Sequence, residues 1–140
     1  MRRLSYTESR WEGGMDSKCV ILLEDEADLA QLVRDLLEDA GFLVVHCTSI
    51  EATLVEAARK SPCVALLDST NPKEFDLWFL GPRLLEMGVP AIAFTAHATA
   101  RQQFEADSSG FVGVLDKPFD ADEFVSVVEA ICWDADEVAS

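Results

Sequence analysis

The chain has 140 residues, of which 26 are Asp or Glu and 11 are Lys or Arg, so its formal net charge is −15. A chain that is 49% hydrophobic is too apolar to be disordered throughout, and its length suits one domain. The charge argues against binding to nucleic acids or anionic membranes, because clustered Lys and Arg supply that affinity. We therefore expect neither a nucleic acid nor a membrane as a partner.

The N-terminal segment, residues 1–17, is polar and shows no sustained period, so we expect a flexible tail there. Arg2 and Arg3 are not followed by the apolar stretch that an export signal requires, which favours a cytoplasmic protein. Either Met1 or Met15 can be the native start.

Four cysteines are spread along the chain without a Cys-x-x-Cys pair or a metal-binding spacing. Disulfide frameworks are typical of short secreted chains, and a free cysteine beside an apolar run behaves as a small hydrophobic residue. We therefore expect reduced thiols at all four positions, namely Cys19, Cys47, Cys63 and Cys132.

The first predicted strand is the continuously apolar run Cys19–Leu23, as expected for a parallel strand covered on both faces. Apolar residues then recur at helical spacing from Leu29 to Ala40 and predict a helix that ends before Gly41. The second predicted strand is Leu43–Cys47.

Either Thr48 or Ser49 can cap a second helix, which is followed by the third predicted strand, Cys63–Leu67. The third helix is harder to place because Gly81 and Pro82 interrupt it. Either a short helical turn ends at Leu80, or the helix begins at Pro82 as its first residue, and we favour the second alternative.

The fourth predicted strand is Ala91–Phe94, and a weaker helix covers about residues 99–106. After a short fifth strand, Val112–Leu115, the last helix opens with Asp120 and Glu123 in capping-box spacing. Five strands alternating with five helices predict an α/β fold, a doubly wound parallel sheet with helices on both faces. We place this domain at residues 18–133 and a short acidic tail at residues 134–140.

Polar residues follow four of the predicted strands, at the edge where open α/β sheets bind their ligands. They are Glu24, Asp25 and Glu26 after the first strand, Asp68 after the third, Thr95 after the fourth and Lys117 after the fifth. Each residue alone would more readily be a helix cap, a turn residue or a solvated charge. Their joint occurrence after four strands favours a functional site.

Carboxylates at this edge repel one another by about 3 kcal/mol per pair at ~5 Å and an effective dielectric of ~20. A cation must offset this repulsion, and oxygen ligands suit Mg²⁺. A phosphoryl group on Asp68 would meet the metal, the Lys117 ammonium and the Thr95 hydroxyl, which are the groups that phosphoryl transfer needs.

Four sequence motifs stand at the predicted strand ends: ILLEDE at 21–26, VALLD at 64–68 with Pro72 four residues later, TAH at 95–97 and KPF at 117–119. Together they resemble the receiver domain of two-component response regulators, and the resemblance extends from about Cys19 to Cys132. It implies a flavodoxin-like, CheY-like sheet with strand order 2-1-3-4-5. It also implies Mg²⁺ as cofactor and a histidine kinase or phosphotransferase as phosphoryl donor.

Carried over by position, the resemblance makes Asp68 the phosphoacceptor. Asp25, Glu24 (through a water molecule) and the backbone carbonyl of Thr70 would complete the metal site with Asp68.

Thr95 and Lys117 would contact the phosphoryl group, and the Lys117–Pro118 bond would be cis, as is typical in the family. His97 lies two residues past Thr95, where it could influence access of the hydrolytic water. His46, in the second strand, is expected to be packed or partly exposed.

The chain departs from the family pattern at several positions. Val114 stands where the family usually has Tyr or Phe, and Asp76 stands where it usually has Gly. The usual readout through the fourth helix and fifth strand is therefore in doubt. Residues 71–85 contain three aromatic residues, Phe75, Trp78 and Phe79. We hypothesise that signalling runs through this segment and that one or more of these residues is exposed to a partner. The alternative is that all three pack in the core.

The leading interpretation is a stand-alone receiver, monomeric or weakly dimeric, which acts on a downstream protein target and on no metabolite. A pseudo-receiver that works without phosphorylation is an alternative, which Val114 keeps open. An Mg²⁺-dependent aspartyl-phosphate phosphohydrolase is disfavoured, because Thr70 stands where such enzymes need a second Asp. A flavin binder is disfavoured by the acidic first strand–helix turn.

Overall fold

The computed structural model describes residues 18–68, 75–95, 110–116 and 119–139, with the backbone alone at residues 75–78, 95, 116 and 134–139. The strands are β1 (Cys19–Leu23), β2 (Leu43–Cys47), β3 (Val64–Asp68), β4 (Ala91–Thr95) and β5 (Phe111–Asp116). The helices are α1 (Ala27–Asp39), α2 (Ile50–Lys60), α3 (Phe75–Glu86) and α5 (Ala121–Ala139). The helix expected at about residues 99–106 lies outside the described residues.

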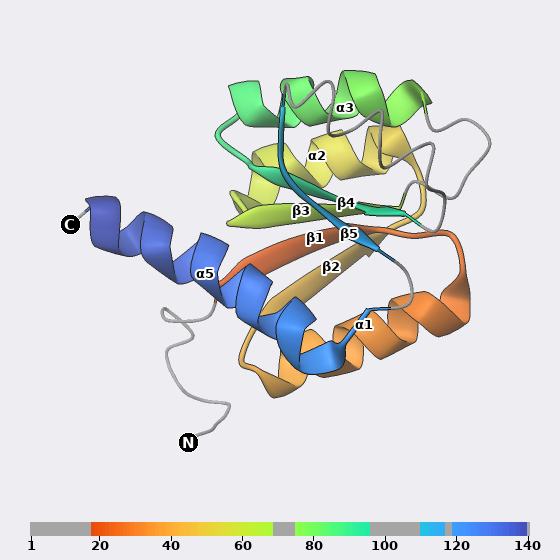
Figure 1. The fold of residues 1–140 in the computed structure, drawn as a ribbon. Helices are drawn as coiled ribbons and strands as arrows, with labels where there is room; N and C mark the ends of the chain where they lie inside the picture. Colours follow the sequence, from red (N-terminus) through yellow and green to blue (C-terminus); the bar gives the residue numbers. More distant parts are fainter. Residues whose placement is uncertain (1–17, 69–74, 96–109, 117–118, 140) are drawn as a thin grey trace.

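The strands form one sheet in the order β2-β1-β3-β4-β5, and every neighbouring pair is parallel. Helices α2 and α3 cover one face and α1 and α5 cover the other (Figure 1). The predicted doubly wound sheet and its strand order are confirmed. Strands β3, β4 and β5 each end one residue later than predicted, so Asp68 and Thr95 are the last residues of their strands. In addition, β3 begins one residue later than predicted and β5 one residue earlier.

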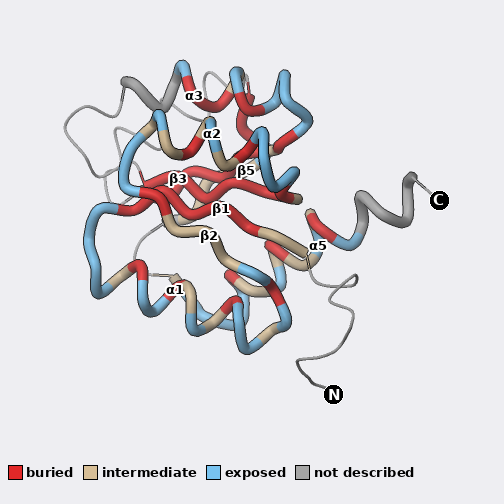
Figure 2. Tube along the Cα trace, turned by 180° about the vertical axis from the view of Figure 1, so that it is seen from behind, coloured by how far each residue is buried: buried red, intermediate tan, exposed pale blue. Residues whose placement is uncertain are grey.

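Two apolar clusters fill the spaces between the sheet and its helices. Along β1, Ile21 and Leu23 point toward α2 and α3, whereas Val20 and Leu22 point toward α1 and α5. Burial on both faces explains why the central strands are continuously apolar: Figure 2 shows β1 and β3 buried along almost their whole length, and residues 91–94 of β4 are fully buried as well. This packing fixes the strand ends from which the functional residues extend.

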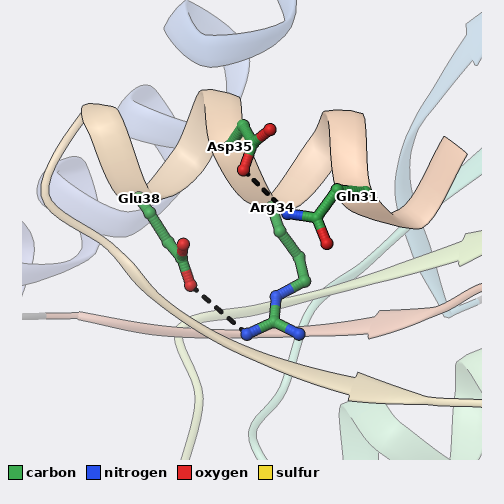
Figure 3. Close-up of polar contacts among 4 residues, drawn as sticks. All are labelled: Gln31, Arg34, Asp35 and Glu38. Carbon is green, nitrogen blue, oxygen red and sulfur yellow. Dashed lines mark hydrogen bonds and ion pairs between the residues drawn. The ribbon is translucent and has the colours of Figure 1, made fainter. Parts of the chain in front are cut away.

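Helix α1 buries Ala30, Val33 and Leu37, and Gly41 follows its end with φ of +97°. Leu32 fits the apolar spacing of the helix but is 50% exposed. The part of the α1 surface that is buried against the sheet is therefore narrower than the stripe formed by all its apolar residues. The solvent face carries two contacts at i,i+4 spacing (Figure 3). They are a hydrogen bond from Gln31 to Asp35 at 2.8 Å and an ion pair between Arg34 and Glu38 at 3.5 Å.

Side-chain caps start α2 and α5 as the sequence predicts. The Ser49 hydroxyl accepts a hydrogen bond from the Ala52 N–H at 3.0 Å, which decides between the two candidate caps of α2. The Asp120 carboxylate accepts one from the Glu123 N–H at 2.9 Å and caps α5.

The predicted start of α3 at Pro82 is wrong, because the helix begins at Phe75 and contains Pro82. Its glycine has a packing role that outweighs its low helix propensity. A Cβ on Gly81 would lie 2.4 Å from the Phe111 ring, so only glycine lets α3 come this close to β5.

Helix α5 continues to Ala139, so residues 134–139 of the expected acidic tail belong to the last helix. Charge alone suggested a tail. However, no Gly or Pro interrupts residues 121–139, so nothing local ends the helix.

The cysteine expectation is half wrong. Cys63, just before β3, forms a disulfide with Cys132 on α5, with 5.2 Å between their Cα atoms and a sequence separation of 69. Cys19 and Cys47 are free, and burial raises the pKa of both thiols, so both are protonated at neutral pH.

Among the described residues, no helix is long and apolar enough to cross a membrane.

Gly88 and Gly110 both have φ of +83°, but their surroundings differ. A Cβ on Gly88 would meet nothing within 4 Å, whereas one on Gly110 would lie 2.3 Å from the Pro82 backbone nitrogen. Both alanine substitutions incur the left-handed backbone penalty, and only Gly110→Ala adds a backbone clash. We expect Gly110→Ala to lower the free energy of unfolding by about 2 kcal/mol more than Gly88→Ala. Urea unfolding measures both, and equal losses would contradict the close approach of α3 to the start of β5.

Candidate functional site

Three carboxylates meet at the carboxyl ends of β1 and β3. These strands are parallel neighbours, and their register pairs Leu23 with Leu67, so Glu24, just after β1, and Asp68, the last residue of β3, emerge side by side. One ligand oxygen from each of Glu24, Asp25 and Asp68 lies within 4.8 Å of the other two. The structure thus brings together all three predicted acidic residues.

The three side chains differ in exposure. Glu24 is only 1% exposed and Asp68 only 7%, whereas Asp25 is exposed. Buried carboxylates need compensating contacts, and Glu24 Oε2 accepts a hydrogen bond from the Glu26 N–H at 3.1 Å. Glu26 is the N-cap of α1, so this bond holds the Glu24 carboxylate at the positive end of that helix.

The backbone of Glu24 is held against β2 by two hydrogen bonds. Its N–H donates to the Cys47 carbonyl at 3.1 Å, which continues the β1–β2 ladder beyond the strands. The His46 ring nitrogen Nε2 lies 2.6 Å from the Glu24 carbonyl oxygen. His46 is partly buried, as expected, but its contact with the acidic segment is a feature that the sequence analysis missed.

Electrostatics make the cluster a candidate cation site. At 4.8 Å, two full negative charges repel by about 3 kcal/mol at an effective dielectric of ~20. The donors are all carboxylate oxygens, which hard divalent cations such as Mg²⁺ prefer. The residues present therefore fit a magnesium ion, and the exposed Asp25 leaves the cluster open to solvent.

The other predicted site residues are placed only in part. Thr95 ends β4, next to β3, where Asp68 is paired with Phe94, so its backbone lies at the same edge as the acidic cluster. Thr70, His97, Lys117 and Pro118 lie outside the described residues, and so does the predicted cis bond. Their roles remain predictions.

The positions that depart from the family pattern have different environments. Val114 is partly buried and packs against the cluster that includes Phe111, on the face covered by α2 and α3. Phe79 on α3 is 68% exposed, in line with the hypothesis of an exposed aromatic residue there. The side chains of Phe75 and Trp78 lie outside the described residues.

Comparison with known proteins gives one family. A family model described as "Response regulator receiver domain" matches residues 20–129. An uncharacterized 14.6 kDa protein of Leptolyngbya boryana is 32% identical over 117 residues, which cover 81% of this chain and 88% of that protein. The KDP operon transcriptional regulatory protein KdpE of Escherichia coli is 28% identical over 71% of this chain, which corresponds to only 44% of KdpE.

Solved structures show the same fold. The receiver domain of a sensor histidine kinase from Pseudomonas aeruginosa, described with a magnesium ion coordinated in its active site cleft, superposes with a TM-score of 0.69. It is 20% identical, and the match covers 83% of this chain and 98% of that one. The family match covers most of the described chain, and the sheet order agrees with it. The chain belongs to the response regulator receiver domain family.

Proposed function

We propose that this chain is a phosphoacceptor receiver, in which Asp68 takes a phosphoryl group from a histidine kinase or phosphotransferase. The observation that supports this most strongly is the position of Asp68, buried at the end of a central strand with Glu24 and Asp25 within 4.8 Å. The family match supports the same role, since receiver domains are signalling modules of two-component systems.

We propose that Mg²⁺ is held by Glu24 (through water), Asp25, Asp68 and the backbone carbonyl of Thr70. When bound, the ion supplies positive charge that offsets the carboxylates and the phosphoryl oxygens. The all-oxygen donor set supports this assignment, and so does the magnesium ion described for the Pseudomonas receiver domain.

In the transfer itself, a carboxylate oxygen of Asp68 attacks the donor phosphorus, and the bond from phosphorus to the donor nitrogen or oxygen breaks. The electron pair of that bond leaves with the donor group: a nitrogen leaving group takes up a proton, whereas acetate leaves acetyl phosphate as the anion. Lys117 and Thr95 bind the phosphoryl oxygens, as their positions in the family motif imply. Burial of Asp68 limits access of water to the acyl phosphate.

The output of this module is a protein contact with a downstream target. The chain is proposed to act on no metabolite, to reside in the cytoplasm and to be monomeric or weakly dimeric. With a net charge of −15 it is proposed to bind no nucleic acid and no membrane itself.

The direct test is chemical phosphorylation. Incubation with Mg²⁺ and acetyl phosphate or phosphoramidate is expected to add one phosphoryl group per chain, seen by intact mass and removed by hydroxylamine. Asp68→Asn is expected to abolish the adduct, because an amide cannot form it. Asp39→Asn, at the far exposed end of α1, is the matched control and keeps the adduct. An adduct that survives in Asp68→Asn contradicts the proposed acceptor.

A pseudo-receiver is the second candidate, and one observation favours it. Val114 packs against the core at the position of the usual aromatic switch, and a valine has no ring that could move with the phosphoryl group. Absence of an adduct with every donor would support this candidate. Multiple turnover of unrelated phosphate esters would instead support a phosphohydrolase.

A further inference from the structure

His46 is the described side chain that ties β2 to the segment carrying the acidic cluster. Its Nε2 atom lies 2.6 Å from the Glu24 carbonyl oxygen. A carbonyl oxygen only accepts hydrogen bonds, so Nε2 carries the proton and donates it. The bond joins residues that are 22 positions apart in the sequence.

The bond acts on a short stretch of backbone that leaves β1 and enters α1. Within this stretch, the Glu24 N–H donates to the Cys47 carbonyl, and the Glu24 carboxylate accepts from the Glu26 N–H. His46 adds the contact at the carbonyl, so the peptide group between Glu24 and Asp25 is held from the β2 side. The orientation of that peptide group sets the direction in which the Asp25 side chain leaves the backbone.

The partly buried position makes this bond stronger than a similar one on the surface. Without the imidazole, the Glu24 carbonyl would lose its donor from β2. The peptide group would then lose one of its restraints, and the three carboxylates would be held less firmly in the arrangement that brings their oxygens within 4.8 Å. A cation site depends on such fixation, because outer contacts orient its ligands.

We infer that His46 is a positioning residue for the cation site, holding Glu24 and Asp25 in the arrangement that binds Mg²⁺. The inference deepens the proposed function and rests on the metal site named there. It assigns a role in metal affinity to a residue that touches neither the ion nor the phosphoryl group.

The test separates metal affinity from fold stability. Urea unfolding in EDTA gives the stability of the metal-free protein, and its increase with Mg²⁺ concentration gives the dissociation constant by mass action. We expect His46→Leu to weaken Mg²⁺ binding about tenfold, which is the lower end of the loss in metal affinity that is typical when a residue that orients the metal ligands is replaced. His46→Gln places an N–H donor near the position of Nε2, and we expect its dissociation constant to stay within about twofold of wild type, because the donor to the carbonyl is kept.

Val45→Ala is the matched control. Val45 is the neighbour of His46 on β2 but packs on the opposite face, against the cluster below α2. We expect it to lower the stability in EDTA and to leave the Mg²⁺ dissociation constant unchanged. The inference is overturned if His46→Leu binds Mg²⁺ as tightly as wild type, if His46→Gln is as weak as His46→Leu, or if Val45→Ala weakens binding equally.

The measurement uses no phosphoryl donor, so it is independent of the phosphorylation test. A wild-type protein that binds Mg²⁺ but forms no adduct contradicts the proposed acceptor chemistry and leaves the role of His46 standing. A wild-type protein that binds no Mg²⁺ overturns both.

Discussion

Asp25→Asn is expected to weaken Mg²⁺ binding by about a hundredfold or more and, at the same time, to stabilise the metal-free protein. Asp25 is the exposed member of the cluster, and its charge repels the buried Glu24 and Asp68. Removing that charge relieves two repulsions, which solvent screening reduces to a total of about 1 kcal/mol. The same change removes an anionic ligand from the cation site, so the affinity falls.

Both effects are read from urea unfolding with EDTA and with increasing Mg²⁺. Asp28→Asn is the matched control, because it makes the same charge change three residues later, in the exposed first turn of α1. Asp28 interacts favourably with the helix N-terminus, so its loss is expected to destabilise the protein by about 0.5 kcal/mol. Mg²⁺ affinity should change little in Asp28→Asn. Stabilities that move in the same direction in the two variants would contradict a repulsive acidic cluster.

The sheet and the acidic cluster were predictable because both depend on local patterns. A parallel strand buried on both faces must be continuously apolar, so the run Cys19–Leu23 matched β1 residue for residue. The run Leu43–Cys47 also matched β2 residue for residue, although β2 is an edge strand and mostly only partly buried. Once the sheet is parallel, the residues at the carboxyl ends of β1 and β3 must share one edge. The meeting of Glu24, Asp25 and Asp68 follows from that topology.

The features that the sequence analysis missed depend on contacts between distant segments. Gly81 fits a helix because the Phe111 ring occupies the space where a Cβ would be, and no local rule reveals that neighbour. The contact of His46 with Glu24 follows from the β1–β2 register, which pairs Leu23 with Cys47 and places both residues at the same strand ends. This signal was present, but it becomes usable only when the register is known.

The largest expected stability change comes from the disulfide between Cys63 and Cys132, which the cysteine spacing did not reveal. The bond closes a loop across 69 residues, from the start of β3 to α5. In the chain-entropy description a loop of this length stabilises the folded state by about 4 kcal/mol, since the cross-link restricts the unfolded chain. Cys63→Ala and Cys132→Ala are each expected to lose most of this amount.

The double variant is expected to lose little more than either single variant, because both single substitutions remove the same bond. Cys47→Ala, at a buried free thiol at the end of β2, is the control and loses only its packing contribution. Wild-type protein in dithiothreitol should unfold at the urea concentration of the double variant. If reduction leaves wild-type stability unchanged, the thiols are unpaired, as the spacing alone predicted. Disulfides seldom persist in reducing compartments, so the stability in dithiothreitol is the value that would apply in such a compartment.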